Sequence, residues 1–257
     1  FIGDNIMALP KIETPIYSLK LPSDQKQTVS YRPFLVKEEK ILLTAMEGAK
    51  ELKGQAFQSI VRDVILRIIK NCTDGKIDGT KLPAFDIDFL FLNIRAKSRG
   101  EIIEPSFTCN QEDKKGEVCG HVEKYKIKID EIKIDFPDKD YSKIMVTEEV
   151  GIQLKYMSTE EMKIHDSEED AIEKMFKIIV DSIDYVFDAE SVYKGKESSK
   201  AELSTFVENL NAEAFDNIKE FFSHQPKLKH DIDYKCSKCG HREPVVLEGL
   251  EDFFGFA

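Results

Sequence analysis

A repeated cysteine motif is the feature that most restricts the fold of this chain. The tripeptide Cys-Gly-His occurs at residues 119–121 and again at residues 239–241, and each copy follows another cysteine. In the second copy the two cysteines form a C-x-x-C motif, which lets both thiolates face one ion, and the next glycine permits a tight turn. The first pair is wider and is a weak signal alone, but four sulfurs together predict one closed, tetrahedral, structural zinc site per chain. The predicted ligands, called here the four-cysteine clip, are Cys109, Cys119, Cys236 and Cys239.

Other interpretations of these residues stay open at this point. Cys236 and Cys239 could form a redox pair, although such a motif normally opens a helix and strand-like residues follow here. His121 or His241 could replace one cysteine as a ligand. Cys72 lies after two isoleucines and is expected to be a small buried apolar residue.

A zinc ion on the four-cysteine clip would join two distant parts of the chain. Residues 121–235 would be enclosed between the two cysteine pairs, and part of the folding free energy would depend on the metal. We predict a domain of residues 1–99, with a hairpin and helices, and a second domain of residues 100–257 that contains the clip and a helical insertion.

Length and charge exclude several classes of protein. The chain has 257 residues, and 37 basic against 48 acidic residues give a formal charge of 37 minus 48, or −11. This charge disfavours non-specific electrostatic binding to nucleic acid or anionic lipid. Five cysteines are too few for a secreted disulfide scaffold of this size and indicate a reducing compartment.

No membrane segment or signal peptide is expected. The most apolar stretches, residues 85–94 and 176–187, are each interrupted by two aspartates, whereas a membrane span needs about 20 mainly apolar residues. The first six residues lack a basic region followed by a long apolar one. Met7 is a plausible natural start, which would make those six residues extraneous.

The first hundred residues predict a β-hairpin and three helices. Two short alternating runs between Pro15 and Phe34 flank a polar turn, which is typical of a hairpin. Apolar residues recur at helical spacing over residues 37–52 and 55–71, and a third helix is predicted after Pro83, with basic residues in its last turn.

The pattern changes near Gly100. Short runs at residues 102–107, 125–129, 132–136 and 151–156 alternate apolar with polar residues and predict antiparallel strands. Helices are predicted at residues 168–187 and 212–224, and a final strand pair at residues 229–235 and 243–247. Residues 193–200 are expected to be a solvated loop, with a helix start near Ser204 and Glu208. The predicted class is therefore α+β, with a hairpin and helical bundle followed by an antiparallel β/α domain that carries a zinc-ribbon-like clip.

The sequence contains no recognised catalytic motif. A glycine-rich phosphate loop, a nucleophile elbow and an H-E-x-x-H helix are all missing, and acidic runs such as residues 168–170 are typical of a solvated helix turn. We predict that the protein is not an enzyme. The C-terminal run, residues 245–256, ends with phenylalanines beside acids and is expected to dock on its own domain. The alternative is insertion into the groove of a partner.

Four segments carry a family resemblance. They are Ala8 to Pro15, Tyr31 to Lys40, Phe89 to Ser98, and Cys236 to His241 with the tail Leu-Glu-Gly-Leu-Glu-Asp-Phe-Phe. These segments resemble the baseplate hub and hub-assembly proteins of T-even-type contractile-tailed bacteriophages, over nearly the whole chain from Met7. The resemblance implies a non-enzymatic hub subunit or hub-assembly factor that acts through other tail and baseplate hub proteins. It also implies a location in the host cytoplasm during assembly, or in the virion tail baseplate.

The segments Tyr31 to Lys40 and Phe89 to Ser98 are the expected partner contacts, because charged residues such as Arg32 and Arg95 lie among apolar ones there. Both arginines could equally well cap or bridge their own helices. The sequence does not decide whether the protein forms a homo-oligomer. The main competing function is a zinc-ribbon nucleic-acid-binding or transcription-associated protein. The cysteine regions speak against it, because they mix lysines with acids and a nucleic-acid-binding face needs clustered cations. An enzyme whose site assembles from scattered residues is a weaker alternative.

Overall fold

The computed structural model describes residues 13–49, 52, 54–112, 114–165 and 170–254, and has the predicted mixed α+β class. The predicted start at Met7 and the last three residues lie outside this description. Among the described residues, no helix has the length and apolar character needed to cross a bilayer.

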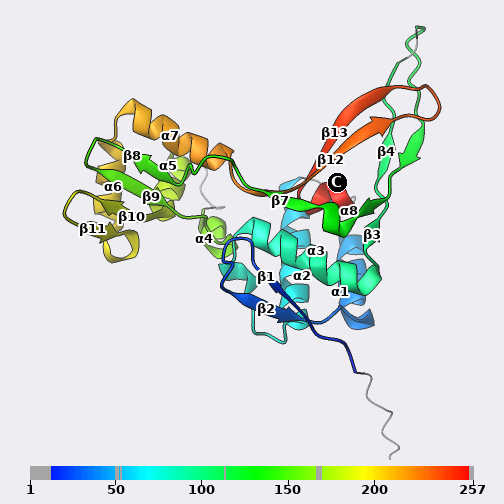
Figure 1. Cartoon of the computed structure of the whole chain (residues 1–257), viewed down its shortest axis with the longest axis horizontal. Coiled ribbons are helices and arrows are strands. Elements are labelled where there is room, and N and C mark those ends of the chain that lie inside the picture. Colours follow the sequence, from blue (N-terminus) through cyan, green and yellow to red (C-terminus); the bar gives the residue numbers. More distant parts are fainter. Residues whose placement is uncertain (1–12, 50–51, 53, 113, 166–169, 255–257) are drawn as a thin grey trace, which may run out of the picture.

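The N-terminal part is a hairpin against three helices (Figure 1), as predicted. Strands β1 (Tyr17–Lys20) and β2 (Thr28–Tyr31) pair antiparallel. The helices are α1 (Val36–Gly48), α2 (Gln55–Cys72) and α3 (Ala84–Arg99), with a 3₁₀ turn at Gly79–Lys81. Pro83 caps α3, where its missing N–H costs no helical hydrogen bond. The buried Asp86 carboxylate accepts the backbone N–H and the hydroxyl of Ser23, which fixes the hairpin turn to α3.

The Arg32 side chain forms a buried ion pair within this part. Its Nη2 lies 3.1 Å from Oε1 of Glu38, a residue with 0% exposure, and its Nη1 lies 3.3 Å from Oε2. Nη2 also donates to the carbonyl of Asn71, and Glu38 accepts the N–H of Leu35. Arg32 therefore bridges its own helices and is not presented to a partner.

Most later strands form small antiparallel sheets around the clip. Strand β3 (Ile102–Ile103) pairs with β6 (Ile127–Lys128), and β4 (Ser106–Thr108) pairs with β5 (Val122–Lys124). Strand β12 (Lys227–Lys235) lies between β7 (Lys133–Asp135) and β13 (Arg242–Glu248), with a 3₁₀ turn at Ile129–Glu131 before β7. The last helix, α8 (Gly249–Phe254), buries Leu250 and Phe253 against α3, so the expected docking of the C-terminal run on its own chain is confirmed through residue 254.

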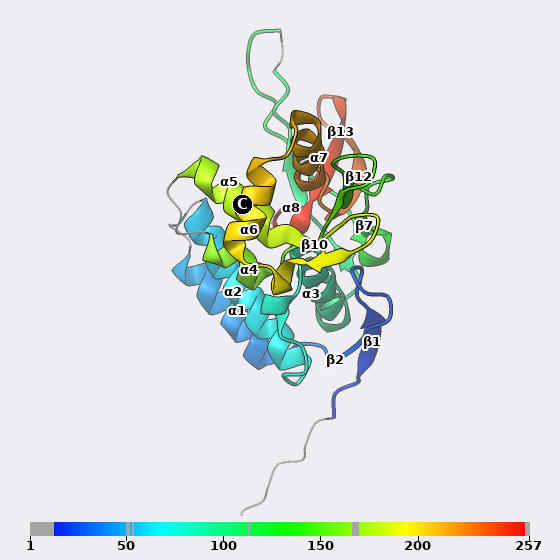
Figure 2. The same cartoon turned by 90° about the vertical axis from the view of Figure 1, so that its left-hand side faces the viewer.

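The remaining elements form a lobe to one side, visible at the left of Figure 1 and facing the viewer in Figure 2. Its sheet has the order β11-β10-β9-β8. The strands are β8 (Lys143–Met145), β9 (Gly151–Leu154), β10 (Ile183–Phe187) and β11 (Val192–Lys194), and the helices are α4 (Thr159–Ile164), α5 (Ala171–Ser182), α6 (Lys200–Glu208) and α7 (Ala212–Ser223). The Tyr156 ring packs edge-on against Phe85 at 5.2 Å, and Thr159 donates to Leu82, which joins this lobe to α3.

Two sequence-based predictions in this lobe are wrong. The helix predicted at residues 168–187 ends at Ser182, and residues 183–187 form β10, because an apolar run of this length suits either element and pairing with β9 and β11 decides it. The next helix begins after Ser199, whose hydroxyl and Glu202 form a capping box, so Ser204 is inside α6. The expected loop contains the end of β11, a 3₁₀ turn at Gly195–Glu197 and the start of α6.

The buried apolar side chains form two large clusters. The first joins residues from 21–132 with residues from 228–253, and the second lies within residues 144–221. Apolar packing alone does not define a cooperative folding unit, so the division of the chain after residue 99 stays a prediction.

Candidate metal centre

The four predicted ligands lie together where the β4–β5 and β12–β13 hairpins meet. Cys109 follows β4 and Cys119 precedes β5, while Cys236 and Cys239 occupy the turn between β12 and β13. All four sulfur atoms lie within 4.8 Å of one another. Cys109 and Cys239 are 130 residues apart in the chain, and Cys119 and Cys236 are 117 residues apart, so only the tertiary fold brings these sulfurs together.

The distances between sulfurs fit a tetrahedral metal. The Sγ atoms of Cys109 and Cys239 are 3.7 Å apart, and those of Cys119 and Cys236 are 3.8 Å apart. Four sulfurs at about 2.3 Å from a central ion would have tetrahedral edges of about 3.8 Å. A disulfide would require about 2.05 Å, and all five cysteines are free thiols. The cluster could therefore hold a metal ion.

The two cysteine pairs share two backbone hydrogen bonds, although a longer loop separates the first pair. In the first, the N–H of Cys109 donates to His121 at 2.8 Å and the N–H of Gly120 donates to Cys109 at 3.0 Å. Both bonds recur in the second pair at 2.9 Å, with Cys236, His241 and Gly240 in the same roles. Gly120 and Gly240 have φ values of +62° and +76°, which side chains with a Cβ rarely adopt.

Backbone donors surround the sulfurs of the C-x-x-C turn. The N–H groups of Cys239 and Lys238 donate to the Cys236 sulfur and lower its pKa to about 6. The N–H of His241 acts the same way on Cys239, but burial and the neighbouring thiols outweigh it and raise the Cys239 pKa to about 12. Four thiols this close share protons, and a divalent cation would favour the thiolate form of all of them.

The two histidines lie at the rim of the cluster. His121 Nε2 is 2.9 Å from the Ser237 hydroxyl and 3.5 Å from a Glu123 oxygen, and His241 Nε2 is 3.5 Å from a Glu243 oxygen. Neither belongs to the group of potential ligand atoms that the described residues bring together. The C-x-x-C turn lies between two strands, whereas a thioredoxin-type pair would open a helix.

Three aromatic side chains that were not predicted from the sequence pack between the two hairpins. Tyr234 is 2% exposed and packs with Phe107 and Tyr125, with ring centroids 6.2 and 6.0 Å away. The Tyr125 hydroxyl accepts the N–H of Lys235 at 2.6 Å, which ties β12 to the first hairpin. The available signal was an aromatic residue in or directly beside each of three predicted strand regions.

Polar contacts also join the two hairpins directly. Lys238 Nζ donates to the carbonyl of Cys119 at 2.9 Å, and the Ser237 N–H donates to Glu123 at 2.9 Å. A lysine whose ammonium donates a hydrogen bond to a carbonyl within the clip is less available for a phosphate backbone.

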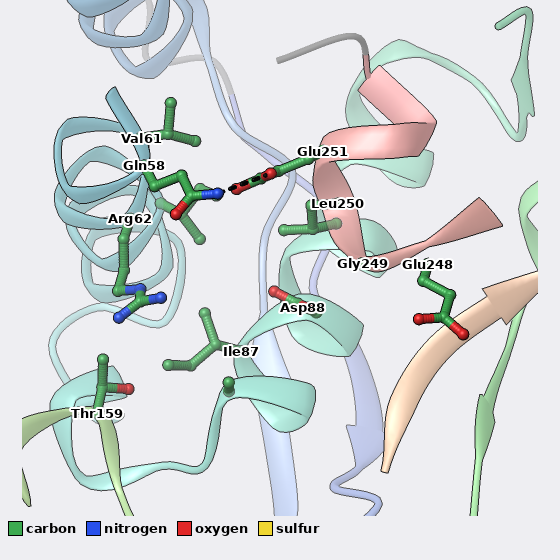
Figure 3. A pocket seen from close by; sticks show the side chains of 12 residues that line it. Gln58, Val61, Arg62, Ile87, Asp88, Thr159, Glu248, Gly249, Leu250 and Glu251 are labelled. Carbon is green, nitrogen blue, oxygen red and sulfur yellow. Dashed lines mark hydrogen bonds between the residues drawn. The ribbon is translucent and has the colours of Figure 1, made fainter. Parts of the chain in front are cut away.

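A separate cavity of about 180 Å³ lies between α2, α3, α8 and the start of α4 (Figure 3). Its walls include Ile87 and Leu250, and at its rim Gln58 donates to Glu251 at 3.2 Å. Asp88 points into it from α3, and burial raises the Asp88 pKa to about 7 although Arg62 opposes this. Sequence patterns missed this carboxylate because nothing in its local sequence sets it apart from the other acids.

The Asp88→Asn substitution is expected to stabilise the protein at pH 8. The ordinary Asp pKa is 3.8, so between this pH and about 7 the folded state holds a proton that the unfolded state has released, and stability falls as pH rises. Asparagine removes this loss. The midpoint of thermal unfolding should rise by about 2–6 °C at pH 8 and by less at pH 5. Exposed Asp184→Asn is the control, and an unchanged or lower midpoint for Asp88→Asn at pH 8 would contradict the assignment.

Comparison with known proteins identifies a family. A family model described as "T4 bacteriophage base plate protein" matches residues 14–255, and so spans both cysteine pairs and both apolar clusters. No curated protein and no solved structure shows a significant match to the chain.

Proposed function

Because the chain belongs to the T4 bacteriophage base plate protein family, we propose that it is a non-enzymatic baseplate hub subunit or hub-assembly factor. The observation that carries this proposal is the family match over residues 14–255, combined with the resemblance of its N-terminal segments to hub proteins. Family membership implies other baseplate proteins as partners. The protein would act in the host cytoplasm during assembly and would either leave or remain in the tail baseplate.

We further propose that the four-cysteine clip holds one structural zinc ion. Four sulfur ligands leave no position for water, which suits a structural site better than a catalytic one. Cys109, Cys119, Cys236 and Cys239 would hold the ion, and its contribution would be to lock the β4–β5 hairpin onto the β12–β13 hairpin. The sulfur distances of 3.7 and 3.8 Å support this choice.

Nothing specific favours the nucleic-acid alternative. A ribbon that binds nucleic acid needs clustered free cations. In the clip Lys238 is bonded to the Cys119 carbonyl, and acids such as Glu123 and Glu243 lie beside both histidines. The formal charge of −11 points the same way.

Affinity purification of the tagged chain from infected cells tests the hub proposal. Other baseplate proteins are expected to co-purify in fixed ratio and to survive nuclease treatment and moderate salt, because protein contacts and not phosphates hold the complex. A tagged unrelated protein of similar charge is the control. Recovery of nucleic acid alone, or of no tail protein, would overturn the proposal.

A further inference from the structure

A groove that contains a partly buried arginine lies where α1, α3 and α8 meet. Its volume is about 370 Å³. The apolar side chains that line it are Phe34, Leu42, Leu43, Phe91 and Phe254. Arg95 and Arg99 of α3 add two guanidinium groups to this apolar lining.

Among the described residues, the Arg95 guanidinium has no acidic partner. Its Nη1 is buried without a hydrogen bond, and within the described part of the chain no carboxylate forms an ion pair with it. The guanidinium lies over the face of the Phe254 ring, 4.7 Å from Cζ to the centroid. Burial lowers the Arg95 pKa. Burial of a guanidinium without a carboxylate costs free energy. The contacts of Arg95 within the described part of the chain do not offset this cost.

The other charges at the groove already have partners. Arg99 pairs with Glu39, the acidic residue of the groove lining. Arg32, the other arginine of the family-like segments, is engaged by Glu38. The groove therefore has an excess positive charge on a chain whose formal charge is −11.

The rim of the groove is apolar and exposed. Leu43, which lines the groove, is 62% exposed. Val36, which is not part of the lining, is 80% exposed and lies seven residues earlier on the same face of α1. Arginine is one of the residue types that are enriched at interface hot spots.

We propose that this groove binds a segment of another baseplate protein that carries an aspartate or glutamate next to a large apolar side chain. The carboxylate would accept hydrogen bonds from Arg95, a charge-assisted pair that is stronger than a neutral hydrogen bond. The apolar side chain would cover Leu42 and Leu43. Charge complementarity selects this partner over a basic segment, and the apolar lining selects a peptide over a free anion. The inference rests on the proposed function and deepens it.

Photo-crosslinking tests this site. The chain would carry p-benzoylphenylalanine in place of Leu43, would be assembled with the other baseplate proteins of the same virus, and would be irradiated. We expect cross-links to a segment of another baseplate protein in which an acid adjoins a large apolar residue. The control position is Tyr193, which is 52% exposed on β11 and is expected to give no cross-link to that segment.

The Arg95→Met variant separates binding from folding. Loss of one partner of a buried charge pair should weaken binding of the cross-linked protein at least about thirtyfold, while the thermal midpoint stays the same or rises because a buried unpaired charge is removed. Exposed Arg67→Met, which changes the net charge equally, should leave binding within about twofold.

Four outcomes would overturn the inference. They are cross-links from Leu43 to a basic segment, cross-links to a second copy of this chain, assembly without any cross-link at Leu43, and full binding by Arg95→Met. In all four the proposed function survives if baseplate proteins are still recovered. Recovery of no baseplate protein with any variant would overturn the proposed function itself, and this inference with it.

Discussion

Replacement of Cys239 by serine is expected to abolish metal binding at the four-cysteine clip and to lower the free energy of unfolding by more than about 3 kcal/mol. Structural zinc contributes about 10–16 kcal/mol in small zinc-finger peptides, and part of this should appear here if the proposed ion joins the two hairpins. Cys239 is exposed, so the substitution removes little packing. A large loss of stability would therefore report the lost ligand.

Elemental analysis and thermal unfolding measure this effect together. The wild type should contain about one zinc per chain and the variant none. The control is the wild type with a strong chelator, whose unfolding curve should coincide with that of the variant. Hydrogen exchange should show opening at residues 107–109 and 234–236, where the hairpins meet. A wild type without metal and with Cys236 bonded to Cys239, or a variant that keeps its zinc, would contradict the metal assignment.

Replacement of Arg32 by methionine is the second substitution with a large expected effect. It would leave the Glu38 carboxylate, which has 0% exposure, without its cation. Breaking a buried pair on one side costs about 3–5 kcal/mol, because an uncompensated charge stays in the interior. Chemical denaturation should show this loss as a lower midpoint with an unchanged slope.

The double variant Arg32→Met/Glu38→Leu is the matched control. Since both charges are removed, most of the stability should return, and a double variant as unstable as the single one would show that shape and not charge explains the loss. The exposed pair of Lys97 and Glu101 offers a second control, because Lys97→Met should have little effect.

Acid should act on the same pair. Burial opposes ionisation of Glu38, but the hydrogen bonds from Arg32 and from the Leu35 N–H outweigh it and lower the Glu38 pKa below its ordinary value of 4.5. A carboxylate with a lowered folded pKa contributes its full stability above the unfolded pKa, and the contribution disappears as pH falls through the folded pKa. The wild type should therefore lose stability below about pH 4.5, and Arg32→Met should lose much of this dependence.

Several elements follow from local sequence because the physics that forms them is local. Alternating apolar residues around a polar turn specify the β1–β2 hairpin, and the helical spacing of apolar residues specifies α2 and α7. The spacing of Cys236 and Cys239 and the glycines after Cys119 and Cys239 specify two turns that can present thiols to one ion.

Other features depend on neighbours that are distant in sequence. Residues 183–187 are apolar enough for a helix or a strand, and the edge of β9 decides for a strand. Arg32 and Arg95 look alike in the sequence, yet the fold places Glu38 beside one and the Phe254 ring beside the other. Burial in the cavity between α2, α3 and α8 raises the Asp88 pKa, and α8 is distant in the sequence from the other two helices.

The sequence by itself determined the α+β class, the four cysteines and the negative charge, because residue type and short spacing decide these properties. The tertiary structure decided which sulfurs face each other, which arginine lacks a carboxylate among the described residues and where an apolar groove stays open. These depend on long-range packing: the energy of a charge or a thiol is set by whatever lies within a few ångströms of it, and residues more than a hundred positions away supply those neighbours.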